Sequence, residues 1–211
     1  IFLSLTLLGG CARKGPVLRS TARPGQDVWL SGRTGESAAG LAVLERGEKR
    51  EDPDFAPLVQ RHLRPGPRLR LGRELARRGL ATAMIDVSDG LAQDAGHVAR
   101  MSGLRIRMEA GRLPRPETLE RAASRLGLDP LSLMLSGGED YELLFTADRN
   151  NRDAVSEAAQ AADVAVTRIG ETQAGRGVSV FGADGEELPP ARYGAGYDHF
   201  RQAEKEKPLP P

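Results

Sequence analysis

The 211-residue sequence is poor in cysteine and aromatic residues and has almost no net charge. Its single cysteine, Cys11, cannot form an internal disulfide, which fits a reducing compartment, and one thiol cannot build a thiolate metal site. The 30 basic and 29 acidic residues leave a formal net charge of +1, so no overall field would gather nucleic acid or anionic lipid. An anionic ligand would therefore need a local binding site.

The sequence also lacks a long hydrophobic run. Residues 1–8 are too few to span a bilayer, although their continuation into Leu-Gly-Gly-Cys resembles a lipoprotein signal. Neither a Met nor a basic segment precedes them, as such a signal requires. The alternation of Phe2, Leu3, Leu5 and Leu7 with polar residues instead predicts a β-strand. We expect a cytoplasmic protein without a membrane or nucleic-acid partner, and a chain truncated at its start.

Helical periodicity and strand alternation interleave along the rest of the chain, with glycine and proline at the breaks. Helices are predicted after the turn at 32–37 and at residues 54–63, 69–78, 91–101, 116–127, 130–135 and 152–162. Strands are predicted at residues 28–31, 81–86, 104–108, 141–146 and 164–169, and a hairpin at 184–185. The pattern predicts an α+β (α/β) sandwich, in which helices cover a mixed β-sheet, over residues 1–200, and a disordered tail at 201–211.

The turn at residues 32–37 is rich in glycine and opens a helix with apolar positions at Ala38, Leu41, Ala42 and Leu44. Free N–H groups at such a helix start can bind a phosphate. The same glycines can also serve only to reverse the chain. The sequence leaves both interpretations open.

A first chemical motif, Asp86-Val87-Ser88-Asp89-Gly90, follows an apolar strand and precedes a helix. Strand alternation directs Asp86 and Ser88 to one side, and the turn can bring Asp89 round to join them. Magnesium takes one or two carboxylates together with phosphate and water oxygens, so two aspartates match its needs. Ser88 could donate a hydrogen bond to a phosphate.

Helix capping is the alternative explanation of this motif. Ser88 or Asp89 immediately before an amphipathic helix is the residue type that an N-cap requires. Capping does not account for Asp86 at the end of an apolar strand, because an unpaired carboxylate is costly to bury. A binding site and a cap can also coexist.

A second motif, Ser136-Gly-Gly-Glu-Asp-Tyr-Glu-Leu143, combines paired glycines with three acids. The glycines allow the backbone to approach a ligand closely. Alternation places Glu139 and Tyr141 on one face and Asp140 and Glu142 on the other, so the acids cannot all serve one purpose. An ordinary glycine turn feeding an edge strand would look the same.

In order and spacing, the two motifs together resemble the thiamine-monophosphate kinase family. The residues that carry the resemblance are Asp86–Leu91, Asp94–His97, Ser136–Phe145 and Gly196–Phe200, with weaker likeness at 19–25 and 34–40. The wider group includes aminoimidazole ribonucleotide synthetase, selenophosphate synthetase and a hydrogenase maturation protein. The resemblance implies the fold of the C-terminal domain of these proteins for residues 1–200, and the second motif narrows the choice to the kinase.

The resemblance implies magnesium-assisted transfer of the γ-phosphoryl group of ATP to thiamine monophosphate, which gives thiamine diphosphate. Asp86 and Asp89 would bind Mg²⁺, and Ser88 would contact ATP. Glu139 and Tyr197 would contact thiamine monophosphate, the tyrosine through a cation–π contact with the thiazolium ring. No side chain is expected to act as a catalytic nucleophile, because the acceptor phosphate is itself one. Asp94 is left without a role, and His97 is expected to be structural.

Family members also have an N-terminal domain that supplies further metal ligands, much of the nucleotide site and a homodimer interface. No such domain precedes Ile1 in this sequence, so the fragment alone is expected to bind nucleotide weakly and not to turn over. Two alternatives remain: another ATP-dependent member of the same superfamily, and a non-catalytic nucleotide-binding or interaction module.

Overall fold

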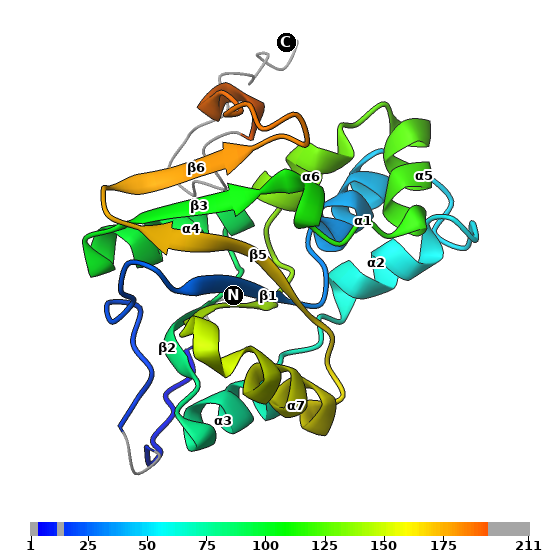
Figure 1. Ribbon diagram of the computed structural model, residues 1–211. Helices are drawn as coiled ribbons and strands as arrows, with labels where there is room; N and C mark the ends of the chain where they lie inside the picture. Colours follow the sequence, from blue (N-terminus) through cyan, green and yellow to red (C-terminus); the bar gives the residue numbers. More distant parts are fainter. Residues whose placement is uncertain (1–3, 12–14, 194–211) are drawn as a thin grey trace, which may run out of the picture.

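A six-stranded mixed β-sheet forms the centre of the molecule in the described part of the chain (Figure 1). The computed structural model describes residues 4–11 and 15–193. Tyr197 and the tail at 201–211 lie outside the described residues. The strands are β1 (Asp27–Ser31), β2 (Ala81–Asp86), β3 (Arg105–Glu109), β4 (Leu143–Ala147), β5 (Val166–Gln173) and β6 (Gly177–Phe181). Their order is β2-β4-β1-β5-β3-β6, antiparallel except for the parallel β3–β6 pair, so the predicted mixed sheet is confirmed.

Helices cover both faces of the sheet and gather beyond one end of its strands (Figure 1). They are α1 (Glu36–Glu45), α2 (Ala56–Leu63), α3 (Leu69–Arg78), α4 (Leu91–Ser102), α5 (Glu117–Leu126), α6 (Pro130–Ser136) and α7 (Arg152–Ala162). Short 3₁₀ turns lie at Ala110–Arg112, Arg149–Asn151 and Pro190–Arg192. This arrangement confirms the predicted α+β sandwich.

Two hydrophobic cores fill the two faces. On one face, Trp29 and Phe145 stack with ring centroids 6.3 Å apart and pack with the buried sides of α3 and α7. On the other face, the neighbouring strand residues Leu30 and Leu144 join a larger core with residues of α1, α2, α4, α5 and α6. Successive residues of β1 and β4 therefore point into different cores, as strand alternation requires.

Local signals account for the helix ends. Gly79, Gly103 and Gly127 follow α3, α4 and α5 and adopt the left-handed conformation that ends a helix most cheaply. Asp129 caps α6 by accepting a hydrogen bond from the Leu131 amide, as its position before a proline indicates. At residue 185 a left-handed glycine turns the chain, and an antiparallel bridge joins Phe181 to Glu187, which confirms the hairpin.

The predicted strand at the start of the chain is wrong for its described residues. Residues 4–11 form no strand, and Leu5, Leu7 and Leu8 are exposed, Leu8 by 97%. Alternating apolar residues predict a strand only where a neighbouring strand can satisfy their backbone groups, and no such partner lies beside them in the described residues. Cys11 is also exposed.

Two predicted helix faces also need correction. The side of α1 that packs into the core carries Ala39, Gly40 and Val43, while Leu41 is exposed. Met101 was expected on the inner face of α4 but is 50% exposed. Judged by its small residues alone, α1 could bury either of two sides. Contact with α2 buries the side that carries residue 40, because only a glycine there avoids a collision with the backbone of Leu58.

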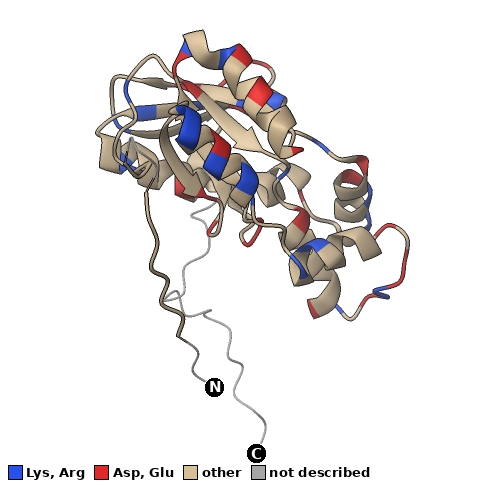
Figure 2. Ribbon diagram, turned by 90° about the horizontal axis from the view of Figure 1, so that it is seen from below, with Lys and Arg blue, Asp and Glu red and all other residues tan. Residues whose placement is uncertain are grey.

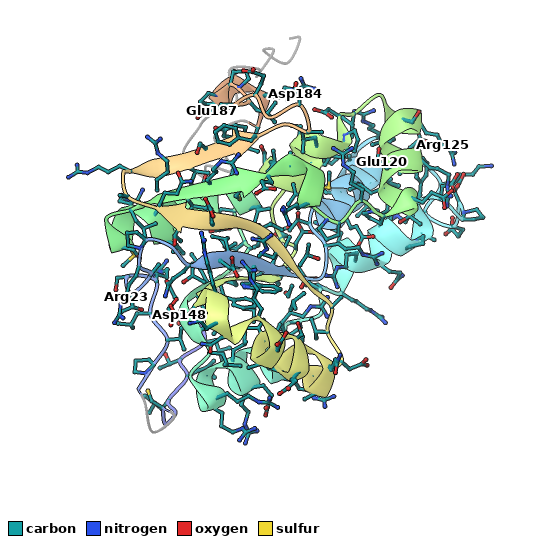
Figure 3. All side chains as sticks on the ribbon, in the orientation of Figure 1. Arg23, Glu120, Arg125, Asp148, Asp184 and Glu187 are labelled. Atoms are coloured by element: carbon teal, nitrogen blue, oxygen red, sulfur yellow. The ribbon has the colours of Figure 1, made fainter. Side chains whose placement is uncertain are left out.

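Positively and negatively charged residues are interspersed over the helices (Figure 2). In the described residues no helix has the length and apolar character of a membrane span. Many of these charges pair between elements. Arg125 of α5, for example, binds both Asp52 and Asp54 in the segment before α2 (Figure 3). These exposed ion pairs contribute modestly to stability.

Candidate functional site

The two chemical motifs lie side by side although about fifty residues separate them in sequence. The β2–β4 ladder continues past the ends of both strands through three backbone hydrogen bonds. Val87 N–H donates to Glu142 O at 2.8 Å, Tyr141 N–H to Val87 O at 2.9 Å, and Glu139 N–H to Ser88 O at 2.8 Å. The structure therefore joins the two motifs at one edge of the sheet.

Glycine is required where the two backbones meet. A Cβ at Gly138 would lie 2.5 Å from the carbonyl oxygen of Ser88. A Cβ at Gly90, whose φ is +117°, would lie 2.8 Å from the carbonyl oxygen of Ser136. Distances under 3.0 Å to backbone atoms leave no room for a side chain, so these glycines allow the two loops to approach each other closely.

The Asp86–Asp89 turn presents its carboxylates outward. Asp86 is exposed at the end of β2, and Ser88 and Asp89 are half-buried. No ion pair among the described residues involves either aspartate. Gln93 Nε2 donates to Asp89 Oδ2 at 3.5 Å, so Asp89 has a neutral polar partner and neither aspartate has a cationic one in the described residues.

Asp94, for which the sequence suggested no role, lies beneath this turn. It is 1% exposed, and its Oδ2 accepts hydrogen bonds from the amides of Ser88 at 3.0 Å and Asp89 at 3.1 Å. Burial raises the pKa of Asp94 to about 6, with a further contribution from the nearby charges of Asp89 and Asp86, while the two amides act in the opposite direction. The cluster therefore concentrates three carboxyl groups in one place.

A histidine borders the acidic cluster. Ligand atoms of Asp89, Asp94 and His97 all lie within 4.8 Å of one another. The Nδ1 atom of His97 lies 2.7 Å from the guanidinium of Arg100, and burial together with that cation lowers the pKa of His97. This pairing fits the structural role expected for His97.

The capping interpretation of the first motif is wrong. Helix α4 begins at Leu91 after Gly90, and no side chain makes an N-cap hydrogen bond there. Instead, the amides of Ser88 and Asp89 donate hydrogen bonds to the side chain of Asp94, which lies in the first turn of α4. Helix capping therefore does not explain the acidic side chains of this motif.

The second motif shows the predicted alternation. Glu139 and Tyr141 are exposed, whereas Asp140 and Glu142 are fully buried. Regular β4 begins only at Leu143, two residues later than predicted, because Glu139 and Tyr141 adopt left-handed backbone conformations with φ of 62° and 50°. The outward and inward acids thus have separate tasks.

Asp140 attaches the second motif to α1. Its Oδ2 accepts from the Gly35 amide at 2.7 Å, and its Oδ1 accepts from the Ser37 amide at 3.2 Å. Burial raises the pKa of Asp140 to about 7, against the lowering effect of these amides and of the Arg61 charge. Because the carboxylate already occupies these two amides, they cannot bind a phosphate, and that interpretation of the 32–37 turn is wrong for them.

Glu142 is the acid of the second motif that pairs with positively charged side chains. Arg68 donates to both carboxylate oxygens at 2.6 Å, Arg61 donates to Oε1, and Ser31 Oγ donates to Oε2 at 2.5 Å. Glu142 and the two arginines line a cavity of about 400 Å³ that Gly32 also lines. Both arginines therefore form ion pairs with a buried acid.

A separate pocket of about 380 Å³ lies between the two motifs and α1. It is lined by Ser37, Ala38, Leu41, His62, Ser88, Asp89, Gly138, Glu139 and Tyr141. Three predicted site residues, Ser88, Asp89 and Glu139, therefore share one pocket, and Asp86 lies at the end of the adjacent strand. Tyr197 lies outside the described residues. Ala38 and Leu41, two of the apolar positions noted in the helix after the 32–37 turn, also line this pocket.

Sequence analysis missed Ser37 and His62. The His62 Nδ1 atom lies 3.0 Å from Ser37 Oγ and 3.5 Å from Glu139 Oε2, so both side chains flank a predicted ligand-binding carboxylate. His62 lies in a helix without a recognisable chemical pattern, and Ser37 ends the glycine-rich turn at 32–37, which was considered only for its N–H groups. Only the packing of α1 and α2 brings them to the pocket.

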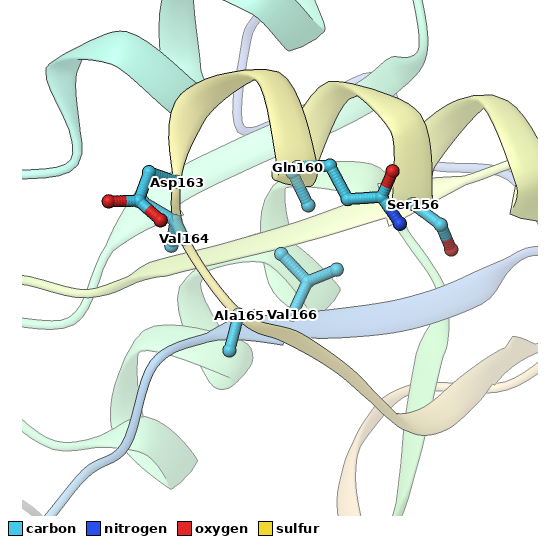
Figure 4. A pocket seen from close by; sticks show the side chains of 7 residues that line it. Ser156, Gln160, Asp163, Val164, Ala165 and Val166 are labelled. Carbon is cyan, nitrogen blue, oxygen red and sulfur yellow. The ribbon is translucent and has the colours of Figure 1, made fainter.

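Another cavity, of about 460 Å³, lies between the end of α7 and the start of β5 (Figure 4). Its lining includes Ser156, Gln160 and Asp163, with valine and alanine side chains below them. Asp163 is its single ionisable residue. The pocket between the motifs, by contrast, is lined by two acids, Asp89 and Glu139.

Comparison with known families matches residues 23–183 to AIR synthase related protein, C-terminal domain. The thiamine-monophosphate kinase of Salmonella typhimurium is 38% identical over 216 residues, covering 94% of this chain and 65% of the relative. The thiamine-monophosphate kinase of Aquifex aeolicus is 35% identical, covering 95% of this chain and 59% of the relative. The chain thus spans less than two thirds of either relative.

Solved structures agree with this match. The thiamine-monophosphate kinase from Stenotrophomonas maltophilia superposes with a TM-score of 0.72 at 38% identity, over 82% of this chain and 54% of that one. A structure described as AaThiL complexed with AMPPCP and TMP gives a TM-score of 0.73 at 35% identity, over 87% of this chain and 54% of that one.

Proposed function

Because this chain belongs to the AIR synthase-related family as a C-terminal domain, we propose that it forms part of a thiamine-monophosphate kinase. The reaction is ATP-dependent phosphorylation of thiamine monophosphate to thiamine diphosphate. The support comes from the relatives of that name, and from a similar structure that holds AMPPCP and TMP. The observation that carries the proposal is the junction of the two motifs at one pocket, where the first motif has carboxylates that form no ion pair in the described residues and the second has Glu139.

The donor set at the Asp86–Asp89 turn fits magnesium. Asp86 and Asp89 offer hard oxygen ligands, and Asp94 adds buried negative charge directly behind them. Three carboxylates without an arginine or lysine partner in the described residues repel a polyphosphate unless a cation intervenes. In the proposed site Asp86 and Asp89 hold Mg²⁺, which when bound neutralises charge on the phosphates of ATP.

The remaining residues of the site position the two substrates. Ser88 donates its hydroxyl to a phosphate oxygen of ATP, because it lies in the pocket beside Asp89. Glu139 and Tyr197 bind thiamine monophosphate, whose thiazolium ring is cationic. The acceptor phosphate attacks the γ-phosphoryl group directly. The protein therefore acts through orientation and charge and needs no side-chain nucleophile.

The larger assembly is also part of the proposal. Residues 1–200 form the C-terminal domain of the kinase, a further domain supplies additional acidic ligands, and the complete enzyme is a cytoplasmic homodimer. The partial coverage of the relatives supports this division. We expect the 211-residue chain alone to bind nucleotide weakly and to show no turnover.

The decisive assay uses the complete gene product with Mg-ATP and thiamine monophosphate, and follows thiamine diphosphate by chromatography. We expect product formation that depends on Mg²⁺ and falls at least a hundredfold in Asp89→Asn, a loss of about 2.7 kcal/mol in transition-state stabilisation. Asp153→Asn, an exposed acid on α7, serves as the control and should leave the rate unchanged. Turnover of selenide or an aminoimidazole precursor instead would assign another member of the superfamily.

A binding measurement on the 211-residue chain separates the kinase from a non-catalytic module. Calorimetric titration with ATP should give heat that requires Mg²⁺, and this heat should disappear in Asp86→Asn/Asp89→Asn. A pure interaction module would give no magnesium-dependent heat. That result, with no turnover by the complete product, would refute the proposed function.

A further inference from the structure

Tyr141 is an aromatic residue held in a backbone conformation that normally favours glycine. Its φ is 50°, and Glu139, two residues earlier, has φ of 62°. The glycines of the same loop are used differently, because Gly137 has φ of −65° and serves close approach to neighbouring backbone. The loop therefore places its left-handed conformations on residues with large side chains. Such strain persists where the surrounding structure imposes it, and it gathers at ligand sites.

Hydrogen bonds impose this conformation from both sides. The amides of Glu139 and Tyr141 are bound to the carbonyl groups of Ser88 and Val87. Between them, the buried side chain of Asp140 is bound to the first turn of α1. The backbone is thus held before and after each strained residue. The result is that Glu139 and Tyr141 both face the pocket while Asp140 and Glu142 face the interior.

The ring of Tyr141 lacks an internal partner in the described residues. The residue is 37% exposed, and neither an aromatic ring nor an arginine there stacks on it, in contrast to Phe145 and Phe181. It lines the same 380 Å³ pocket as Glu139, whose Oε2 lies 3.5 Å from His62 Nδ1. An aromatic face and a carboxylate on one wall suit a flat cationic ring.

We infer that Tyr141 is a specificity-determining residue that lays its ring against the cationic heteroaromatic ring of the phosphoryl acceptor. This inference rests on the proposed function, which makes thiamine monophosphate the acceptor. Glu139 attracts the positive charge, and Tyr141 supplies the flat surface that selects a planar cation over a flexible one. The backbone strain is the cost of keeping both side chains at the pocket.

Three substitutions at residue 141 in the complete gene product test the inference. Tyr141→Phe keeps the ring and should leave the KM for thiamine monophosphate within about twofold. Tyr141→Leu removes the aromatic face and should raise that KM about tenfold, while kcat and the KM for ATP stay within about threefold. An unchanged KM for thiamine monophosphate in Tyr141→Leu, or an equal rise in the KM for ATP, would overturn it.

Tyr141→Gly separates recognition from structure. Glycine adopts positive φ without strain, so this variant of the 211-residue chain should unfold at a denaturant concentration no lower than that of Tyr141→Leu. Its complete enzyme should nevertheless share the raised KM. Asp163→Gly is the matched control, since Asp163 has φ of 56° at the end of α7 and does not line this pocket. It should tolerate glycine equally well without any change in KM.

A ligand series distinguishes failure of this inference from failure of the proposed function. Calorimetry compares thiamine monophosphate with hydroxyethylthiazole phosphate, which has the ring and phosphate but no fixed positive charge. Tyr141→Leu should weaken binding of the cationic ligand about tenfold and leave the neutral one within about twofold. Equal losses for both would overturn the cation-recognition role. If the unaltered enzyme binds and phosphorylates neither ligand, the proposed function itself is wrong.

Discussion

Glu142 and Asp94 are both buried carboxylates at the same edge of the sheet, but their surroundings differ in charge. Two arginines and a serine hydroxyl surround Glu142. In the described part of the chain the Asp94 carboxylate accepts from two backbone amides and has Asp86 and Asp89 beside it. The buried carboxylate of Glu142 therefore has its own cationic partners, whereas the group around Asp94 carries an excess of negative charge in the described residues.

This difference separates a structural acid from one that faces a ligand site. A buried ion pair is satisfied when the chain folds, so the group around Glu142 joins β1, α2 and β4 without help from a ligand. An unbalanced group of carboxylates costs free energy until a cation arrives, which is a property of binding sites more than of cores. Charge balance thus distinguishes Glu142 from the three aspartates, although all four lie in acidic motifs.

The largest expected effect is the loss of the Glu142 carboxylate. Glu142→Gln leaves Arg61 and Arg68 without their anion and should lower the free energy of unfolding by about 3–5 kcal/mol. Urea denaturation measures this change. Glu157→Gln, at an exposed and weakly paired position on α7, is the control and should change stability by less than about 1 kcal/mol. If Glu142→Gln lowered the free energy of unfolding by less than about 1 kcal/mol, Glu142 would not be a structural acid, and its contrast with Asp94 would fail.

Asp140→Asn should have the next largest effect. The Gly35 and Ser37 amides bind different oxygens of Asp140, so an asparagine can accept from only one of them. One buried N–H is left without a partner, at a cost of about 1–3 kcal/mol near pH 5. Denaturation at that pH measures it. A neutral result would mean that α1 shifts to satisfy the amide, which a crystal structure of the variant would show.

The same residue predicts a pH dependence of stability. The pKa of Asp140 is raised from 3.8 to about 7 in the folded chain, so the folded state binds a proton more tightly than the unfolded state. Its contribution to stability is complete below about pH 4 and is lost as the pH rises through about 7, with a slope of at most about 1.4 kcal/mol per pH unit. Urea titrations between pH 5 and 8 in EDTA should show this loss, and Asp140→Asn should reduce it. Equal slopes in the two proteins would contradict the assignment.

Asp94→Asn should have the smallest effect on folding. Both amides bind the same oxygen, Oδ2, so the single carbonyl oxygen of asparagine can accept both hydrogen bonds. Removing a buried charge next to Asp86 and Asp89 offsets the remaining cost, and we expect a change within about 1 kcal/mol. Denaturation without divalent cations tests this. A loss as large as that of Glu142→Gln would show that Asp94 is a structural acid and would end the contrast.

Several elements could be predicted from local sequence because their signals are local. The bounds of α3, β2 and α7 agree with the prediction, since apolar periodicity and nearby glycine or proline define them. The predicted separation of Glu139 from Asp140 was also correct, although left-handed backbone at Glu139 and Tyr141 produces it and not a regular strand. The predicted strand over Leu5 and Leu7 was wrong because a strand depends on a partner that local sequence does not specify.

The candidate site was predicted in part for the same reason. Residues grouped within a motif, such as Ser88 and Asp89, could be identified from the chemistry of their side chains. Asp94 and His62 could not be given roles, because their importance depends on which amides and carboxylates tertiary packing brings against them. The roles of Asp86, Asp89, Ser88, Glu139 and Tyr197 as ligand-binding residues stay predictions.

The sequence by itself determined the two acidic motifs and the helices and strands with strong local signals, such as α3, β2 and α7. These features follow from backbone geometry over a few residues. The tertiary structure alone decided that the motifs meet, that Glu142 is neutralised while Asp94 is not, and that α1 and α2 complete the pocket. Such features depend on contacts between residues far apart in the chain, and only the β2–β4 pairing and the packing of the helices create them.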